Sequence, residues 1–272
     1  MNEFIKDLSL LITKVRETSP LIHSITNNVT INDCANIILA IGASPIMADD
    51  ENEMEDIVRL SSALVLNLGT LNNNTIRAMV RAGKAANTLG IPIVLDPVGA
   101  GASTLRNSTV DSLFSQLNID ILRGNLSEIS YCAGLQVSTK GVDTSPSDYD
   151  KDGIAVAQTV AKKYQCVTVI TGAQDVISDG KRTVTIDNGN PMMSRVTGTG
   201  CMATALTGAF AGISNTMFSA AVVSIAVMGI AGETAYEMAG NKGTASFRTA
   251  LIDSVSCMEA STFIKKVRIH EK

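Results

Sequence analysis

The sequence predicts an α/β protein: a three-layer α/β/α sandwich with a mostly parallel central sheet, folded as a single domain over residues 1–272. Short β-branched runs alternate with helix-like segments, which is typical of strands joined by crossover helices. Several runs are apolar at consecutive positions, as expected where helices cover both faces of a sheet. The chain is 45% hydrophobic and 18% charged, so it can bury a large core. The predicted strands are residues 21–25, 44–47, 64–67, 91–95, 119–122 and 167–170.

The other elements follow in chain order. Residues 1–15 predict an amphipathic helix, because charged residues interrupt the apolar stretch that a signal peptide needs. A second helix is expected at about 30–41, and the polar stretch 139–152 predicts a loop. Apolar pairs on either side of Ser178-Asp179-Gly180 predict an antiparallel hairpin at one edge of the sheet. From residue 200 onward the pattern is helical, at 201–213, 217–239 and 245–265.

Charge and cysteine content limit the function classes. The net charge is −4, and no cluster of Lys and Arg is interleaved with aromatic residues, which argues against nucleic acid as a partner. The apolar stretch 217–232 is shorter than the roughly 20 residues that span a bilayer, so we expect a buried helix and no membrane association. The five cysteines are scattered without metal-binding spacing and are typical of reduced thiols in a cytoplasmic protein: Cys34, Cys132, Cys166, Cys201 and Cys257.

Residues 196–201, Val-Thr-Gly-Thr-Gly-Cys, are the most informative segment because they lead into a helix of small residues. Glycines let successive N–H groups point at one spot, and the helix N-terminus adds partial positive charge there, so Gly198, Thr199 and Gly200 predict an anion hole. A tight loop with glycines for packing is the alternative. Cys201 falls in the first turn, where the helix dipole can lower the pKa of a thiol; a buried structural cysteine is equally compatible.

Asp96 follows the strand 91–95, at the sheet edge where open α/β sheets bind ligands. Its carboxylate could hold Mg²⁺ directly or through water, or it could cap the next turn. The glycines of residues 96–102 do not make a dinucleotide fingerprint, because the third glycine is missing and no clear helix with an acidic residue about twenty residues later is expected to follow.

Two further strand ends carry polar groups. Arg123, Asn125 and Glu128 suit a magnesium–phosphate site, while Asn125 and Glu128 also fit an N-cap and its capping-box partner. Thr171 with Gly172 offers a hydroxyl and flexible backbone to a nucleotide, or forms a simple turn.

The segment 23–30 gathers small hydrogen-bonding groups, including Asn27, between a strand and a helix and could line a polar pocket. His23 lacks any triad or metal spacing, so we interpret it as a structural histidine. Met47 could form an apolar wall for a flat heterocycle, although core packing is the usual role of methionine.

Taken together and in order, these loops resemble the hydroxyethylthiazole kinase family of the ribokinase-like superfamily. The similarity covers nearly the whole chain and is carried by H-S-I-T-N-N-V at 23–29, G-A-S-P-I-M at 42–47, D-P-V-G-A-G-A at 96–102, R-G-N-L-S-E-I at 123–129, I-T-G at 170–172, V-T-G-T-G-C at 196–201 and K-G-x-x-S-F at 242–247. The resemblance implies ATP-dependent phosphorylation of 4-methyl-5-(2-hydroxyethyl)thiazole in thiamin salvage. It also implies a homotrimer with active sites at subunit interfaces.

Residue roles come from the same resemblance. It implies substrate contacts at Met47, Asn27 and Gly198, ATP contacts at Arg123 and Thr171, and a Mg²⁺ association of Asp96 and Glu128. Most ribokinase relatives have a catalytic Asp after the last glycine of G-x-G-D, and here Cys201 stands in that place. We hypothesise that Cys201 accepts or orients the substrate hydroxyl.

Three other functions remain open from the sequence. A kinase of the same fold could phosphorylate hydroxymethylpyrimidine or another vitamin alcohol, and a nucleotide-dependent dehydratase could use the same scaffold. The missing G-x-G-D aspartate also allows a non-catalytic nucleotide or vitamin sensor. A purely structural protein would have no reason to place glycines, carboxylates and hydroxyls at several strand ends.

Overall fold

The computed structural model describes residues 2–135, 139–140, 143–144 and 153–272. One nine-stranded sheet, in the order β11-β10-β9-β8-β5-β4-β3-β1-β2, organises this part of the chain. Its strands are β1 (Leu21–Ile25), β2 (Ser44–Ile46), β3 (Ala63–Asn67), β4 (Ile93–Asp96), β5 (Ile121–Asn125), β8 (Val167–Thr171), β9 (Asp175–Ser178), β10 (Thr183–Ile186) and β11 (Ile269–Glu271). A separate antiparallel pair is formed by β6 (Thr139–Lys140) and β7 (Asp143–Thr144).

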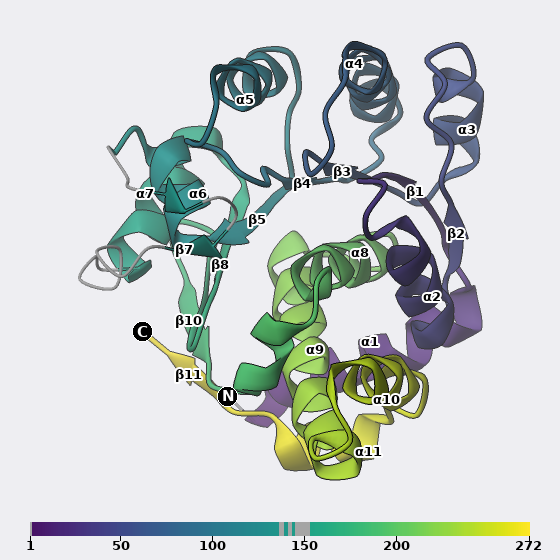
Figure 1. Ribbon diagram of the computed structural model, residues 1–272, viewed down its shortest axis with the longest axis vertical. Helices are drawn as coiled ribbons and strands as arrows, with labels where there is room; N and C mark the ends of the chain where they lie inside the picture. The colour runs from purple at the N-terminus through teal and green to yellow at the C-terminus, as the bar shows by residue number, and fades with distance from the viewer. Residues whose placement is uncertain (1, 136–138, 141–142, 145–152) are drawn as a thin grey trace.

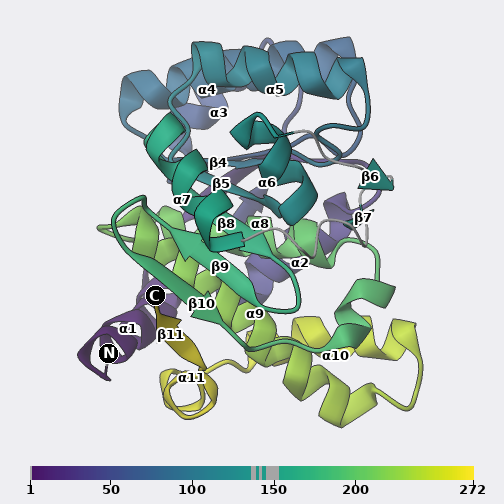
Figure 2. The ribbon, with the colours of Figure 1, turned by 90° about the vertical axis from the view of Figure 1, so that its left-hand side faces the viewer.

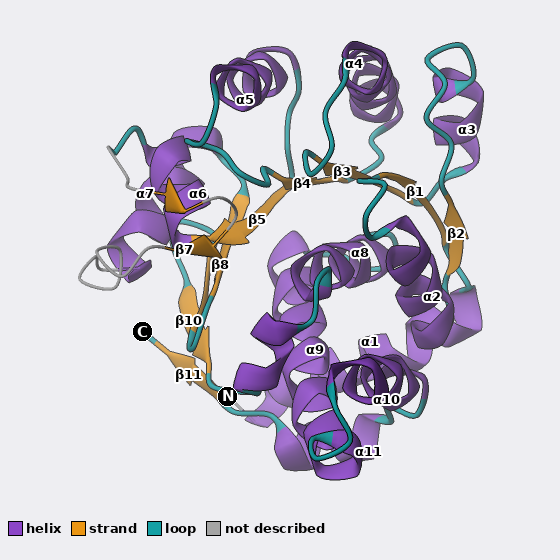
Figure 3. Ribbon diagram, in the orientation of Figure 1, coloured by secondary structure: helices purple, strands orange, loops and turns teal. Residues whose placement is uncertain are grey.

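Helices cover both faces of the sheet, which confirms the three-layer prediction (Figures 1 and 3). One layer holds α3 (Met54–Leu60), α4 (Asn73–Leu89), α5 (Thr104–Gln116), α6 (Leu126–Ala133) and α7 (Gly153–Tyr164). The opposite layer holds α1 (Asn2–Thr18), α2 (Ile31–Ile41), α8 (Thr199–Ala211), α9 (Met217–Ala239), α10 (Thr244–Ser256) and α11 (Ala260–Lys266). A 3-10 helix, Pro191–Arg195, precedes α8. The layers are also visible from the side in Figure 2.

Adjacent residues of the central strands bury their side chains on opposite faces. In β3, Val65 belongs to the core beneath α8 and α9, while Leu64 and Leu66 belong to the core beneath α4 and α5. Every residue of β3 is buried. Consecutive apolar residues are therefore required here, because a strand covered on both faces has no solvent-facing side.

The strand order places a topological switch point between β1 and β3. From β1 the chain moves outward to β2 and then returns to the other side of β1 to form β3, β4 and β5. All neighbouring strands from β2 to β8 are parallel. In open sheets of this kind ligands bind beyond the carboxyl ends of the strands at such a point. A ligand site is therefore expected at the carboxyl ends of β1, β3 and β4.

The antiparallel hairpin is confirmed as β9 and β10, joined through the turn at Ser178-Asp179-Gly180. The outermost strand is β11, however, which pairs with β10 antiparallel. The expected helical C-terminal third therefore ends in a strand, and the expected helix 245–265 is two helices, α10 and α11. Three residues are too few for hydrophobic periodicity to reveal such a strand.

The apolar stretch 217–232 lies in α9. By length and composition α9 could cross a membrane, yet 78% of its most apolar window is buried in the fold. It packs between α8 and α10, which confirms the buried-helix prediction. Most of the predicted loop 139–152 lies outside the described residues.

Candidate active site

The predicted anion hole is the N-terminus of α8. Gly198 is the N-cap, with a left-handed φ of 88°, and α8 begins at Thr199. Met202 N–H donates to the Gly198 carbonyl, so the amides of Thr199, Gly200 and Cys201 precede the first intrahelical bond. A Cβ on Gly198 would come within 2.7 Å of Thr30 Cγ2. A side chain is therefore excluded both by conformation and by space.

Arg123 lies against this helix N-terminus. It projects from β5, and its guanidinium is so close to Gly200 that a Cβ there would be 2.8 Å from Nη1. Its Nη2 donates to Thr171 Oγ at 2.6 Å, and its Nη1 lies 3.5 Å from Asp96 Oδ2. The side chain is 11% exposed, and its Nε has no partner within the described part of the chain. A buried cation beside a helix N-terminus attracts anions strongly. We call this arrangement of Arg123 and the amides of residues 199–201 the anion corner.

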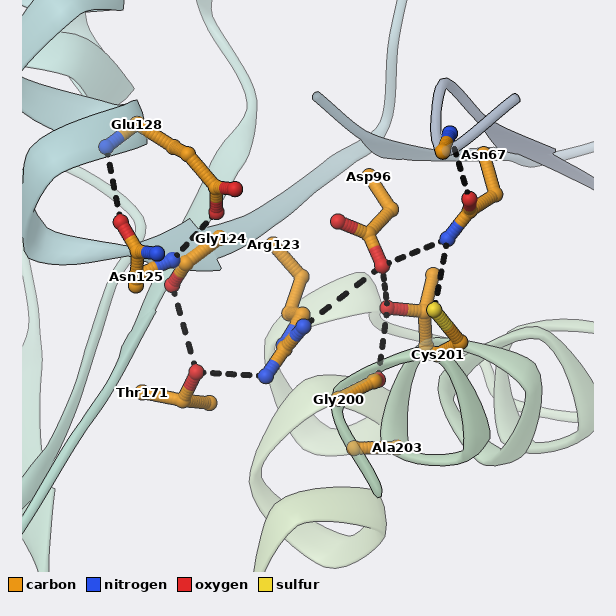
Figure 4. Close-up of polar contacts among 12 residues, drawn as sticks. Asn67, Asp96, Arg123, Gly124, Asn125, Glu128, Thr171, Gly200, Cys201 and Ala203 are labelled. Carbon is orange, nitrogen blue, oxygen red and sulfur yellow. Dashed lines mark hydrogen bonds and ion pairs between the residues drawn. The ribbon is translucent and has the colours of Figure 1, made fainter. Parts of the chain in front are cut away.

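Asp96, at the end of β4, faces α8 (Figure 4). Its Oδ2 accepts hydrogen bonds from Thr204 Oγ at 2.7 Å and Asn67 Nδ2 at 2.9 Å. Its Oδ1 is buried and unpartnered among the described residues. Burial raises the pKa of this carboxyl, and Arg123 opposes that effect. The alternative that Asp96 merely caps the following turn is not supported by these bonds, which run to β3 and α8.

Cys201 lies in the first turn of α8, as predicted, and is surrounded by amides. Asn27 Nδ2 and Asn67 Nδ2 donate to its sulfur at 3.2 and 3.3 Å. Of the two interpretations left open by the sequence, a lowered pKa is not found: burial first, and then the nearby Asp96, raise the pKa of this thiol. Desolvation of the thiolate outweighs the helix dipole because the sulfur is largely enclosed.

Glu128 is tied to backbone. Its two carboxylate oxygens accept from Gly99 N–H and Asn125 N–H, both at 2.8 Å, and Asn125 Oδ1 accepts from Glu128 N–H in return. The capping-box interpretation is therefore confirmed. Burial raises the pKa of Glu128 to about 7, with the Asp96 charge adding to the effect.

The helix α5 begins at Thr104, just after the loop 96–102, so the expectation that no clear helix follows that loop is wrong. Its N-terminal Arg106 donates to the carbonyls of Leu68, Val98 and Gly69, which joins the loops after β3 and β4. The missing third glycine still argues against a dinucleotide fingerprint.

His23 is structural, as interpreted. It is buried in β1, its Nε2 is hydrogen-bonded to the Ala48 carbonyl at 2.9 Å, and burial lowers its pKa. Met47 follows β2, is half-buried and packs against the core beneath α2 and α8. It has no hydrogen bond or ion pair to the other candidate residues in the part of the chain that is described.

The structure thus brings together Asn27, Asp96, Arg123, Thr171 and the α8 N-terminus. Asn67 and Thr204 were not among the residues predicted from the sequence. Asn67 is a polar residue ending an apolar strand, the same signal that identified Asp96. Thr204 lies one turn beyond Gly200, to whose carbonyl it also donates, and this helical spacing gave a weaker signal.

A doubly wound sheet with a helix N-terminus, a buried arginine and a buried carboxylate at its switch point is an arrangement typical of α/β enzymes that act on phosphorylated ligands. The fold is also that of a solved pyridoxal kinase from Staphylococcus aureus in complex with ADP, with a TM-score of 0.60 at 14% identity over 79% of this chain and 88% of that one. The chain belongs to the hydroxyethylthiazole kinase family, whose model matches residues 12–261.

Relatives within the family match along their whole length. A hydroxyethylthiazole kinase of Ruminiclostridium cellulolyticum is 57% identical, covering 100% of both chains. A solved hydroxyethylthiazole kinase structure from Pyrococcus horikoshii has a TM-score of 0.89 at 38% identity, covering 98% of this chain and 99% of that one. The protein is therefore a kinase of this family, and the resemblance noted in its motifs is confirmed.

Proposed function

We propose that the protein transfers the γ-phosphoryl group of ATP to the primary alcohol of 4-methyl-5-(2-hydroxyethyl)thiazole, yielding the thiazole phosphate and ADP in thiamin salvage. Family membership supports this substrate. Hydroxymethylpyrimidine or another vitamin alcohol is the alternative acceptor. The family also favours an enzyme over a nucleotide sensor.

The observation that carries the proposal is the position of Arg123 against the α8 N-terminus. Its guanidinium packs so close to Gly200 that a Cβ there would lie 2.8 Å from Nη1, which sets a side-chain cation beside the free amides of the first turn. Phosphoryl transfer depends mainly on aligning the phosphate and stabilising its charge. This point is suited to the transferred phosphoryl group, with Arg123 and Thr171 contacting ATP.

In the reaction the alcohol oxygen forms a bond to the γ-phosphorus while the bond to the bridging oxygen of ADP breaks. The hydroxyl proton passes to an oxygen of the transferred phosphoryl group or to water. The raised pKa of Cys201 keeps the thiol neutral near pH 7, so we assign it the role of orienting the hydroxyl. A weak base suffices, because general-base assistance contributes only about 10²–10⁴-fold.

The residues fit a magnesium ion. The buried, unpartnered Oδ1 of Asp96 is a carboxylate oxygen, the ligand type that Mg²⁺ prefers. Both oxygens of Glu128 already accept backbone bonds, which favours an indirect role through water. When bound, the ion would neutralise charge on the ATP phosphates.

The acceptor pocket is assigned to Met47, Asn27 and Gly198. Asn27 and Gly198 lie beside Cys201, and Met47 offers an apolar surface at the neighbouring strand end. We also propose a homotrimer with active sites at subunit interfaces and a cytoplasmic location, both by analogy with the family.

The test is ADP release from Mg-ATP with hydroxyethylthiazole, beside hydroxymethylpyrimidine and a control without acceptor. The phosphorylated product is identified by mass. Thiazole-dependent turnover is expected. Turnover with the pyrimidine alone would discard the substrate and keep the chemistry, whereas ATP binding without any turnover would favour the sensor.

A further inference from the structure

Asn67 contacts both Asp96 and Cys201, the two side chains that face the anion corner. It ends β3 at the switch point and is 2% exposed. Its Nδ2 donates both to Asp96 Oδ2 at 2.9 Å and to Cys201 Sγ at 3.3 Å, as Figure 4 shows. One amide group therefore contacts a carboxylate on β4 and a thiol on α8, two elements that are far apart in sequence.

The orientation of this amide is fixed. Gly69 N–H donates to Asn67 Oδ1 at 2.9 Å, and a backbone N–H can donate only to the oxygen. Asn27 Nδ2 donates to the same oxygen at 2.9 Å. Both donors and both acceptor positions of Asn67 are thereby used, and a flip of the amide would make the contacts with Asp96, Gly69 N–H and Asn27 Nδ2 unfavourable.

Asn27 is oriented in the same way, because Thr30 N–H donates to its Oδ1 at 3.1 Å. Its Nδ2 must then face Asn67 and Cys201. The sulfur of Cys201 consequently receives two N–H donors, and its own S–H proton has to point elsewhere. The directions of Asn27 and Asn67 are thereby excluded for the S–H proton, which leaves it to face the Thr30 side chain or a bound alcohol.

We propose that Asn67 is a positioning residue for phosphoryl transfer. Its amide holds the Asp96 carboxylate and the Cys201 sulfur in fixed positions relative to each other at the α8 N-terminus, and it thereby directs the thiol toward the acceptor. The effect on turnover rests on the proposed function. The effect on the sulfur does not, because it exists without any substrate.

The test variant is Asn67→Asp. It keeps an oxygen for Gly69 N–H and Asn27, but replaces the Nδ2 donor with an oxygen facing Asp96 and Cys201. Asn67→Ser, which removes the donor without adding charge, is the second variant in case the first fails to fold. Asn118→Asp, at an exposed position in the loop before β5, adds the same charge outside the site.

The first readout needs no substrate. The rate of iodoacetamide alkylation of Cys201 is measured by peptide mass at a fixed pH, relative to that of the exposed Cys257 in the same chain. Loss of an N–H donor to the sulfur lowers this ratio in Asn67→Asp, and more weakly in Asn67→Ser, while Asn118→Asp leaves it unchanged. An unchanged ratio in both Asn67 variants would overturn the proposal.

The second readout is a double-mutant cycle in kcat with Cys201→Ala. We expect Asn67→Asp to lower kcat by about 10- to 100-fold, the range of a hydrogen bond to a charged group, with KM for ATP within about threefold. The loss is expected to be smaller when Cys201 is already absent. If the losses in kcat from Asn67→Asp and Cys201→Ala were additive, or if Asn67→Asp changed kcat and KM equally, the role of Asn67 would be merely structural. Absence of wild-type turnover would refute the proposed function and leave the alkylation test intact.

Discussion

The substitution Gly200→Ala tests the anion corner directly. The new Cβ would lie 2.8 Å from Arg123 Nη1 and 3.1 Å from Nη2, whereas ordinary contact begins at 3.4 Å. The guanidinium must therefore move by at least about 0.6 Å. It can do so only by weakening its 2.6 Å bond to Thr171 or its approach to Asp96, because Arg123 is otherwise enclosed.

Gly200→Ala is expected to change folding stability much less than kcat/KM for ATP. Alanine in the first helical turn gains about 0.5–1 kcal/mol over glycine, and this offsets part of the cost of moving Arg123. We expect the free energy of unfolding to change by no more than about 1 kcal/mol. Displacing a charge-assisted bond costs about 1.5–3 kcal/mol where phosphate binds, so kcat/KM for ATP should fall about 10- to 100-fold.

The assay combines urea unfolding with steady-state kinetics in ATP. Gly153→Ala is the control, because it also lies in the first turn of a helix and, among the residues that the structure describes, its Cβ would meet nothing closer than 3.7 Å. It should leave kcat/KM unchanged. Wild-type kcat/KM in Gly200→Ala would refute the claim that Arg123 must contact the α8 N-terminus.

Three further outcomes are expected. Asp96→Asn should abolish most turnover and lower the melting temperature, because it leaves the buried Arg123 guanidinium without its ion-pair partner; an unchanged or higher melting temperature measured by calorimetry would contradict this. Asp175 has its pKa raised by burial from 3.8 to about 7, so its stabilising effect is complete below pH 3.8 and is lost as the pH rises through 7. Wild-type stability relative to Asp175→Asn, measured by urea unfolding, should therefore fall by at most ~4 kcal/mol over that range, and a pH-independent difference would exclude the shift. Cys201→Ala should reduce kcat with hydroxyethylthiazole by roughly 10²-fold, and full turnover would show that the thiol does not act on the alcohol.

Local chemistry made much of the site predictable from sequence. Asp96, Arg123 and Thr171 were found because each is the first polar residue after an apolar run, or ends one, and parallel strands end at one edge of the sheet. The glycines before α8 were found because they combine backbone freedom with a helix N-terminus. Both arguments use only neighbours in the chain.

The sequence by itself determined the α/β class, the central strands and the loops that carry the chemistry, because periodicity and strand-end polarity are local properties. Only the tertiary structure showed that Asn67 bridges Asp96 and Cys201, that Glu128 uses both oxygens on backbone amides, and that β11 closes the sheet. It also decided the direction of the Cys201 pKa shift, which the sequence left open. These features depend on burial and on contacts between elements up to 134 residues apart, which no local pattern encodes.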